Sequence, residues 1–390
     1  MLSVEQVRAD TPACREVVHL NNAGSSLPPS VVLDRVIDHL RLEAAIGGYE
    51  AADRVADELA SVYHTIAATI GAGPDEIAIM DSATRAWLAA FTAIPFTPGD
   101  RILTTRAEYS SNIIAMMAAA KHRGVTIQPI PSTESGEVSV DALAAALDED
   151  VRLVAITHAP TNGGLLQPIA EIGRLVRPSP ALFFVDACQS IGQVPIDVAE
   201  LGIDVLAATG RKYLRAPRGT GMLYVRRNLI GQLEPVHIDL HSATTDGDTY
   251  QLRNDARRFE LWERNTAAIL GLGTASRYYR EIGIDAVWDR VRSLGESLRG
   301  MLGELPGIQL TDLGTLRSGI VSFRLADIEP SNIVTTLRTQ RIHVVTSGRP
   351  STPWDMTDRS LESIVRASVH YYNDDTDLHA FVDALRGLDR

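Results

Sequence analysis

Short runs of apolar residues recur along the first 225 residues of the chain, and stretches of amphipathic helical period lie between them. Uninterrupted apolar runs of this kind indicate strands that are buried on both faces, as in a parallel sheet. We therefore predict an α/β fold whose large domain holds a mostly parallel seven-stranded sheet covered by helices. The predicted strands lie at residues 76–80, 101–105, 126–130, 152–157, 181–186, 204–209 and 222–225.

The C-terminal third has a different pattern, with long amphipathic helices and a few separate strands. It predicts a small α+β domain, and we divide the chain into an N-terminal segment (1–25), a large domain (26–256) and a small domain (257–390). A polar region at 237–255 is predicted to be a loop. The main helices are expected at 31–46, 54–70, 266–282, 285–305, 330–338 and 376–388, and further strands at 319–324, 342–345 and 364–372.

Composition limits the possible functions of the chain. The 390 residues carry a formal net charge of −12, which argues against a nucleic-acid backbone or an anionic membrane as the main partner. Two cysteines are too few for a disulfide framework or a cysteine zinc site, and no metal site is expected. The first 20 residues lack a signal-peptide pattern, and no run of eighteen apolar residues occurs. We expect a cytoplasmic protein.

Two of the predicted strands lead to polar residues that indicate chemistry. The run at 181–186 ends in Asp186, and the run at 204–209 is followed closely by Lys212. One crossover separates the runs, so parallel strands would bring both side chains to the same edge of the sheet. For an arbitrary aspartate and lysine, a structural ion pair is the more frequent explanation. The residues around them favour a functional cleft.

Asp186, Gln189 and Lys212 together resemble the class V aminotransferase family, the pyridoxal-phosphate enzymes of fold type I that include cysteine desulfurases, isopenicillin-N epimerases and ergothioneine-pathway C–S lyases. The resemblance covers nearly the whole chain. It implies that Asp186 pairs with the pyridinium nitrogen, that Gln189 touches the ring hydroxyl, and that Lys212 forms the Schiff base. The neighbouring Arg211 is expected to lower the pKa of Lys212, because a nearby positive charge disfavours the protonated amine.

The segment after residue 80 is expected to bind the cofactor phosphate. Small polar residues stand there just ahead of an amphipathic helix, whose free N–H groups and dipole can hold a phosphate. Taken alone, this pattern is more typical of an ordinary helix N-cap. Its place in the chain matches the first phosphate loop of the family, which assigns Ala83, Thr84 and Arg85 to the phosphate. Thr209 and Arg211 are further expected contacts of the cofactor.

Tyr109 is expected to stack on the cofactor ring. Relatives place a ring-stacking residue, often a histidine, just after a glutamate that follows a strand, and this chain has a tyrosine there. An aromatic face fixes the tilt of the ring and contributes on the order of 1 kcal/mol. We therefore count Tyr109 with Lys212 and Asp186 among the catalytic residues, although a tyrosine is less able than a histidine to move a proton near neutral pH.

The segment at residues 158–168 follows another predicted strand. Relatives carry here an asparagine that bonds the ring oxygen and the substrate carboxylate. Counting back from the Gln-Pro pair that ends the segment gives Thr161, whereas the Pro-Thr-Asn-Gly form of the epimerase and C–S lyase branches favours Asn162. We predict Asn162. His158 stands without a polar cluster, so a histidine satisfied at a strand end is a more frequent explanation than a ligand or base.

Two further regions are expected to meet the substrate. The turn-rich segment at 19–29 lines the active-site mouth in the family, which makes Asn22 and Gly24 candidate substrate contacts, although a simple turn is nearly as frequent. Arg366 matches the family arginine that clamps the substrate α-carboxylate, a role that suits the planar guanidinium fork. The expected partner is therefore a small-molecule amino-acid substrate.

The predicted reaction depends on a residue that the sequence lacks. Cysteine desulfurases of the family use a nucleophilic cysteine in the loop before the carboxylate arginine, and residues 346–354 contain none. Cys188 lies on the cofactor side and cannot replace it. We therefore predict a C–S lyase, in which Lys212 removes the Cα proton of an S-substituted cysteine and β-elimination yields a thiol or sulfenate, pyruvate and ammonia.

Variant residues suggest a place within the family. Tyr109, the Pro-Thr-Asn-Gly sequence and the Trp262–Glu263 pair resemble ergothioneine-pathway C–S lyases and related enzymes of lincosamide antibiotic biosynthesis, which implies a cysteine conjugate of specialised metabolism. Epimerisation, transamination and decarboxylating oxidative deamination on the same scaffold are alternatives, as is a binding or regulatory protein without turnover.

Fold type I also implies a homodimer with active sites near the interface. Desulfurases have a Gly-Thr pair in place of Trp262–Glu263, which reaches the phosphate of the neighbouring subunit. A carboxylate beside a phosphate is repelled, so Glu263 is not expected to bind it directly. Arg264 or Asn265 is a candidate for approaching the other active site.

Overall fold

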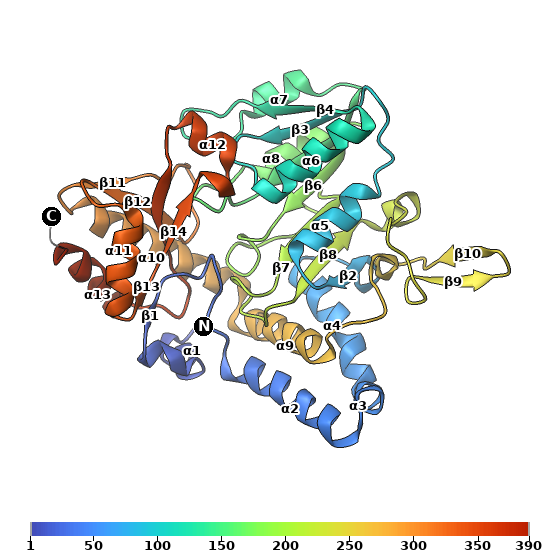
Figure 1. Ribbon diagram of the computed structural model, residues 1–390, viewed down its shortest axis with the longest axis horizontal. Helices are drawn as coiled ribbons and strands as arrows, with labels where there is room; N and C mark the ends of the chain where they lie inside the picture. Colours follow the sequence, from blue (N-terminus) through green and yellow to red (C-terminus); the bar gives the residue numbers. More distant parts are fainter. Residues whose placement is uncertain (1, 389–390) are drawn as a thin grey trace.

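The computed structural model describes residues 2–388, and its largest element is a seven-stranded sheet (Figure 1). The strands lie in the order β2-β8-β7-β6-β5-β3-β4, and β8 runs in the direction opposite to the other six. The predicted α/β fold with a mostly parallel sheet is therefore confirmed. The strand bounds are β2 Ile77–Met80, β3 Arg101–Thr105, β4 Thr126–Ile130, β5 Val151–Thr157, β6 Leu182–Asp186, β7 Val205–Thr209 and β8 Gly221–Val225.

Both faces of the large sheet are buried, as the continuous apolar runs predict. Successive residues of a strand point to opposite faces, so Phe184 belongs to the core on one face while Phe183 and Val185 belong to the core on the other. Helices α5 and α6 lie over the first face, and α4, α8 and α9 adjoin the second. The helices of this part are α2 Ser30–Ile46, α3 Gly48–Arg54, α4 Ala56–Thr69, α5 Ala83–Thr92, α6 Ser110–Arg123, α7 Val140–Ala146, α8 Ile169–Val176 and α9 Thr266–Ile282.

Helix α9 packs closely against α2 and α4 because two of its contact positions are glycines. A Cβ at Gly271 would come within 2.7 Å of Val36 Cγ2, and one at Gly273 would come within 2.7 Å of Val62 Cγ2. Alanine at either position would therefore force the helices apart. Helix α9, which the sequence places in the small domain, thus packs against helices of the large domain.

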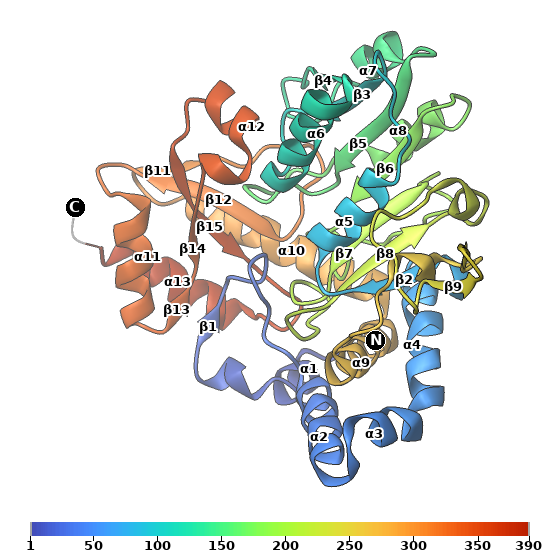
Figure 2. The same ribbon diagram turned by 45° about the vertical axis from the view of Figure 1, so that its right-hand side comes forward.

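The remaining C-terminal elements gather at one side of the large sheet in both ribbon views (Figures 1 and 2). A four-stranded antiparallel sheet has the order β11-β12-β15-β14, and the short β13 pairs in parallel with β1 of the N-terminal segment. Its strands are β11 Ile308–Leu310, β12 Ile320–Leu325, β14 Val345–Gly348 and β15 Ser363–Ser368, and the pair is β1 Val18–His19 and β13 Ile342–His343. The helices are α1 Val4–Ala9, α10 Ile284–Gly303, α11 Pro330–Thr339, α12 Pro353–Asp358 and α13 Asp375–Arg386.

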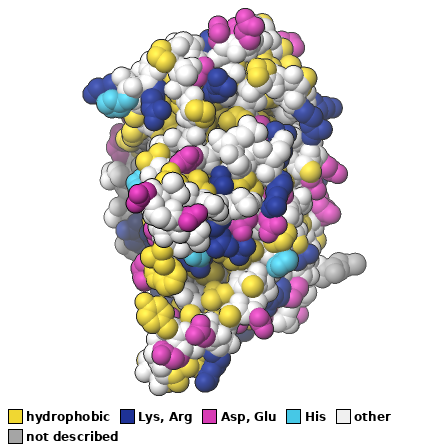
Figure 3. Space-filling model, turned by 90° about the vertical axis from the view of Figure 1, so that its right-hand side faces the viewer, with side chains coloured by type: hydrophobic (Ala, Val, Ile, Leu, Met, Phe, Trp, Pro, Cys, Tyr) yellow, Lys and Arg dark blue, Asp and Glu magenta, His cyan; other side chains and the backbone are white. Residues whose placement is uncertain are grey.

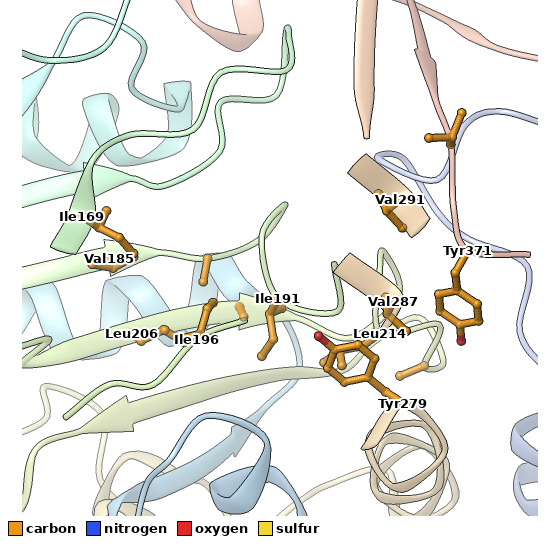
Figure 4. Packing of buried hydrophobic residues seen from close by; sticks show 14 of the residues in the cluster. Ile169, Val185, Ile191, Ile196, Leu206, Leu214, Tyr279, Val287, Val291 and Tyr371 are labelled. Atoms are coloured by element: carbon orange, nitrogen blue, oxygen red, sulfur yellow. The ribbon is translucent and has the colours of Figure 1, made fainter. Parts of the chain in front are cut away.

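One apolar core joins the two sheets. It runs from Val185 and Leu206 beneath the large sheet, past Ile191, to Val287 of α10 and Tyr371 beyond β15 (Figure 4). All five side chains are at most 2% exposed. The segment at 187–191, which follows Asp186, is therefore packed between the large sheet and the C-terminal elements.

Three local expectations differ from the structure. The predicted loop at 237–255 contains an antiparallel hairpin, β9 Ala243–Asp246 with β10 Thr249–Leu252, whose turn includes Gly247 at φ +58°. The helix predicted at 54–70 is interrupted at Val55, which separates α3 from α4. The predicted loop at 346–354 includes the end of β14 and the start of α12. Within residues 2–388 no helix is long and apolar enough to cross a membrane.

Candidate active site

The carboxyl ends of β6 and β7 deliver the predicted catalytic pair to one cavity. Asp186 is the last residue of β6, and Lys212 follows Thr209 at the end of β7, directly alongside. A cavity of about 460 Å³ opens at this edge of the sheet. It is lined by Ser82, Ala83, Thr84, Tyr109, Thr157, Ala159, Thr161, Asp186, Cys188, Gln189, Thr209, Arg211 and Lys212.

Asp186 is held rigidly at the base of this cavity. Its Oδ1 accepts a 2.9 Å hydrogen bond from the Cys188 N–H, and its Oδ2 accepts a 3.0 Å bond from Asn112 Nδ2. The carboxylate is 6% exposed. These two donors are neutral and satisfy the carboxylate only in part, so it remains suited to bind a cationic ring nitrogen.

The Lys212 amine has the electrostatic setting of a base. Burial lowers the pKa of Lys212 below its ordinary value, while the nearby Asp186 opposes that change. The positive charges of Arg211 and Arg366 lower the pKa further, as predicted for Arg211. A lowered pKa increases the fraction of neutral, nucleophilic amine near neutral pH.

The N-terminus of α5 forms another part of the cavity wall. Ser82 caps the helix by accepting a 3.2 Å hydrogen bond from the Arg85 N–H, and Ala83 and Thr84 line the cavity. Gly221 of β8 allows a close approach here, because a Cβ on it would lie 2.5 Å from the carbonyl carbon of Ser82. Free N–H groups and the helix dipole make this end suited to a phosphate.

Arg85 is placed differently from its two neighbours. It lines an adjacent cavity with Glu260, Glu263 and Arg264 instead of the cavity that holds Lys212. Arg211 instead lines the cavity that holds Lys212, and its Nη1 donates a 2.9 Å hydrogen bond to Thr209 Oγ1. Of the predicted cationic contacts, the structure thus brings Arg211 to the cavity and leaves Arg85 outside it.

Thr161 lines the cavity, and the predicted Asn162 does not. The Thr161 hydroxyl lines the cavity and accepts hydrogen bonds from Gln189 Nε2 at 3.0 Å and from Arg366 Nη1 at 2.7 Å. Asn162 turns toward the segment at 347–356, where its Nδ2 donates to Thr352 Oγ1 at 2.7 Å and its Oδ1 accepts from the Ser347 hydroxyl. Consecutive residues of this irregular loop point in opposite directions.

Arg366 lies behind the wall of the cavity and contacts it through the lining residue Thr161. The guanidinium is 7% exposed, and burial lowers the pKa of Arg366 to about 10. Its Nη2 donates a 3.3 Å hydrogen bond to Asn21 Oδ1, and its Nε is buried without a partner. Asn21 is thus a residue of the site that the sequence prediction missed.

The predicted substrate contacts Asn22 and Gly24 lie outside the lining of the cavity. Asn22 is fully buried, donates a 2.7 Å hydrogen bond to the Ser368 carbonyl oxygen and accepts a bond from the Tyr372 hydroxyl. It ties the N-terminal segment to β15. Gly24 borders the Asn21 side chain, to which a Cβ would come within 2.7 Å.

Tyr109 stands at the mouth of the cavity, where it is 36% exposed, and it is the N-cap residue of α6. Its ring lines the cavity, as stacking on the cofactor requires. His158 is buried at the end of β5, and burial lowers its pKa to about 4. It lines another cavity, beside Gln167, and lies at a strand end as predicted, but its Nδ1 is buried without a hydrogen-bond partner, so the predicted satisfied histidine is not found.

Comparison with known proteins decides the family. The model of the family described as Aminotransferase class-V matches residues 18–381. The chain belongs to the class V aminotransferase family. This membership confirms the predicted family and fold type. It also confirms the prediction that the chain is a pyridoxal-phosphate-dependent enzyme and supports a lyase.

Relatives of this class V enzyme match along its whole length. A probable cysteine desulfurase of Methanothermobacter thermautotrophicus is 29% identical over 99% of this chain and 98% of the relative. A cysteine desulfurase of Dickeya dadantii is 29% identical over 99% of this chain and 97% of the relative. The apo structure of the cysteine desulfurase from Thermococcus onnurineus NA1 superposes with a TM-score of 0.90 at 25% identity, covering 100% of this chain and 99% of that one.

A further solved structure is of C-DES with glycine covalently linked to its PLP cofactor. It has a TM-score of 0.89 at 25% identity and covers 98% of this chain and 99% of that chain. The cavity of the present enzyme fits such a cofactor. Gln189 has a buried amide oxygen without a partner, and the Asp186 carboxylate and the Lys212 amine adjoin it in the same cavity.

Proposed function

We propose that this enzyme is a C–S lyase that removes the sulfur substituent from an S-substituted cysteine by β-elimination. The Cα–H and Cβ–S bonds break, the sulfur leaves as a thiolate with the electron pair of the Cβ–S bond and takes up a proton to give the thiol, and water converts the remaining fragment to pyruvate and ammonia. The observation that carries the proposal has two parts. Lys212 and Asp186 line the same cavity, and residues 346–354, where desulfurases of the family carry their nucleophilic cysteine, contain no cysteine. The relatives named above make a carbon–sulfur bond the natural one to break.

Pyridoxal phosphate, when bound, supplies the aldehyde that takes the substrate amine and the ring that accepts the electrons of the Cα–H bond. Asp186 would hold the ring nitrogen in its protonated form, and Gln189 would contact the ring hydroxyl. Tyr109 would lie against the ring face. The N–H groups at Ala83 and Thr84 would hold the phosphate, with Arg211 supplying positive charge.

Lys212 is the residue we assign to the proton transfers. Its lowered pKa favours the neutral amine, which can accept the Cα proton and later return a proton to the leaving sulfur or to water. Arg366 would bind the substrate carboxylate through its planar donors, positioned by Thr161 and Asn21. The substrate's Cα would then lie between these groups.

The fate of the sulfur separates this proposal from desulfuration. Transfer of sulfur to the protein requires a mobile thiolate, and the two cysteines are poorly suited to that role. Cys14 is 8% exposed, and burial raises its pKa to about 11. Burial, with the charge of Asp186, also raises the pKa of Cys188 far above its ordinary value. The sulfur product therefore leaves as a free thiol or sulfenate, in keeping with a cysteine conjugate of specialised metabolism.

The experiment is a product assay with the purified holoenzyme and a set of S-alkyl and S-aryl cysteine conjugates, cystine and cysteine. The proposal expects equal amounts of pyruvate, ammonia and thiol from at least one conjugate. Deuterium uptake at Cα with the side chain retained would indicate epimerisation, and a keto acid that keeps the sulfur would indicate transamination. Loss of CO₂ with oxygen consumption would indicate oxidative deamination, and each of these outcomes would contradict the lyase.

Assembly as a homodimer is part of the proposal. The face that carries the β9–β10 hairpin exposes separate apolar patches among charged side chains (Figure 3). Leu240 is 70% exposed, Val236 60%, and Trp262 50%. Burying such side chains against a second copy is favourable. Sedimentation of the holoenzyme tests this, and a monomer at assay concentrations would contradict it.

A further inference from the structure

A second buried carboxyl group lies directly beneath the predicted cofactor site, at Glu108. It is 1% exposed and is held between β3, β5 and the start of α6. Its Oε1 accepts 2.8 Å hydrogen bonds from the Tyr109 N–H and from Asn112 Nδ2, and a further bond from the Thr157 hydroxyl. Its Oε2 accepts from the Thr157 N–H at 3.0 Å and from Thr104 Oγ1 at 3.3 Å. All of these donors are neutral.

Asn112 connects this carboxyl group to Asp186. The same Nδ2 atom donates one hydrogen to Glu108 Oε1 at 2.8 Å and the other to Asp186 Oδ2 at 3.0 Å. An amide nitrogen has two hydrogens, so both are used by carboxylates and the side chain of Asn112 has one orientation. Glu108 therefore fixes the orientation of the Asn112 amide that donates to Asp186. By accepting from the Tyr109 N–H, Glu108 also holds the first turn of α6 in place.

We propose that Glu108 is a positioning residue whose charge, relayed through Asn112, controls how strongly Asp186 holds the protonated ring nitrogen of pyridoxal phosphate. An ionised Glu108 places a second negative charge behind Asp186, which favours a cation in front of it. A protonated Glu108 removes that charge and weakens the hold. The effect is on the electron-accepting strength of the cofactor and not on a bond that breaks in the substrate.

The surroundings of Glu108 allow it to change charge under working conditions. Burial raises the pKa of Glu108 to about 7, and the charge of Asp186 raises it as well, while the bonds from Thr157 and Asn112 oppose the rise. The titratable groups that face the pair are Asp186 itself, Tyr109 at the start of α6, and Lys212 and Cys188 beyond Asp186.

The sign of the resulting pH dependence follows from the direction of the shift. The folded pKa of Glu108 lies above its usual value of 4.5, so the folded state binds this proton more tightly than the unfolded state does. Its contribution to stability is complete below about pH 4.5 and is lost as the pH rises through about 7. The apoenzyme should therefore lose thermal stability over this range, independently of any catalytic activity.

Three variants test the proposal. Glu108→Gln keeps the size and removes the charge, Thr157→Val removes one bond that lowers the pKa of Glu108, and Asn112→Ala removes the relay. Glu149→Gln, at an exposed carboxylate, is the control. The readouts are the melting temperature of the apoenzyme and the visible spectrum of the bound cofactor, each measured from pH 5 to pH 9.

The wild type and Glu149→Gln should show an inflection in both readouts, near pH 7 for the melting temperature of the apoenzyme. The inflection in the cofactor spectrum should lie at lower pH, because a ring cation that ionised Glu108 favours must in turn favour the ionised form of Glu108. Glu108→Gln should lose both inflections, Thr157→Val should move both to higher pH, and Asn112→Ala should diminish the spectral inflection. An unchanged inflection in a folded Glu108→Gln protein would overturn the proposal. Should that variant fail to fold, an inflection that stays at the wild-type pH in Thr157→Val would overturn it equally.

Discussion

Arg366 Nη1 donates a 2.7 Å hydrogen bond to the hydroxyl of Thr161, and this one oxygen also accepts a 3.0 Å bond from Gln189. Thr161 therefore joins the expected substrate clamp to the expected contact of the cofactor ring. Its neighbour Asn162 serves another purpose, since it holds Thr352 and Ser347 of the segment opposite. The two residues should respond differently to mutation.

Thr161→Val is expected to lower kcat/KM by about tenfold, since it removes an acceptor for a charged donor in a buried place. Thr161→Ser, which keeps the hydroxyl, is the matched control and should retain most activity. Asn162→Ala should leave the spectrum of the bound cofactor unchanged, because its contacts lie on the segment at 347–356. Steady-state kinetics and the absorbance spectrum of the bound cofactor check both expectations. A spectral change in Asn162→Ala and none in Thr161→Val would show that Asn162, and not Thr161, adjoins the cofactor.

Arg366→Ala should reduce kcat/KM by roughly a hundredfold or more, because it removes charge-assisted bonds to the substrate carboxylate. Arg366→Lys keeps the charge and loses the planar fork, so it should recover only part of the activity. The comparison is with a decarboxylated amine analogue, whose binding to the holoenzyme should be nearly the same in all three proteins. Equal losses for the acid and the amine would show that Arg366 acts in some other way.

A cysteine-free enzyme should still cleave its substrate. The double variant Cys14→Ala, Cys188→Ser removes both thiols, and the Cys188 N–H that bonds Asp186 belongs to the backbone and is kept. We expect pyruvate and thiol at rates within a few-fold of the wild type, and mass spectrometry should find no persulfide on either protein. Desulfuration would instead show a persulfide on the wild type and a dead double variant.

Arg211→Gln tests the electrostatic setting of Lys212. The positive charge of Arg211 lowers the pKa of Lys212, so its removal should raise that pKa and move the rise of activity to higher pH. The rate of cofactor uptake by the apoenzyme, followed against pH, should shift in the same direction because it also needs the neutral amine. Shifts to lower pH would contradict this account.

Much of the fold could be predicted because apolar runs report burial directly. The seven strands of the large sheet and their polar ends at Asp186 and Thr209 follow from that signal. The β9–β10 hairpin was missed because its residues are mostly exposed and polar, although an Asp-Gly pair at 246–247 is a recognised turn signal. Exposed strands lack the apolar alternation by which sequence identifies a sheet.

Site residues could be predicted where a strand or helix fixes the direction of the side chain. They could not be predicted where the side chain lies on an irregular loop. Asp186 follows a strand, so its direction is set, whereas the choices between Thr161 and Asn162 and between Asn21 and Asn22 depend on irregular backbone. Glu108 was missed as well. A glutamate four residues before an asparagine, at the junction of a buried strand and a helix, is the signal that could have found it.

The most direct measurement is the attachment site of the cofactor. The chain has two lysines, Lys212 in the cavity and the exposed Lys121 in the last turn of α6. Reduction of the holoenzyme with borohydride, followed by peptide mapping, shows which of the two carries the cofactor. We predict one cofactor equivalent on Lys212, retained in Lys121→Ala and absent from Lys212→Ala, which should also form no thiol from a cysteine conjugate. Cofactor on Lys121, or thiol formation by the Lys212→Ala enzyme at the wild-type rate, would contradict the account.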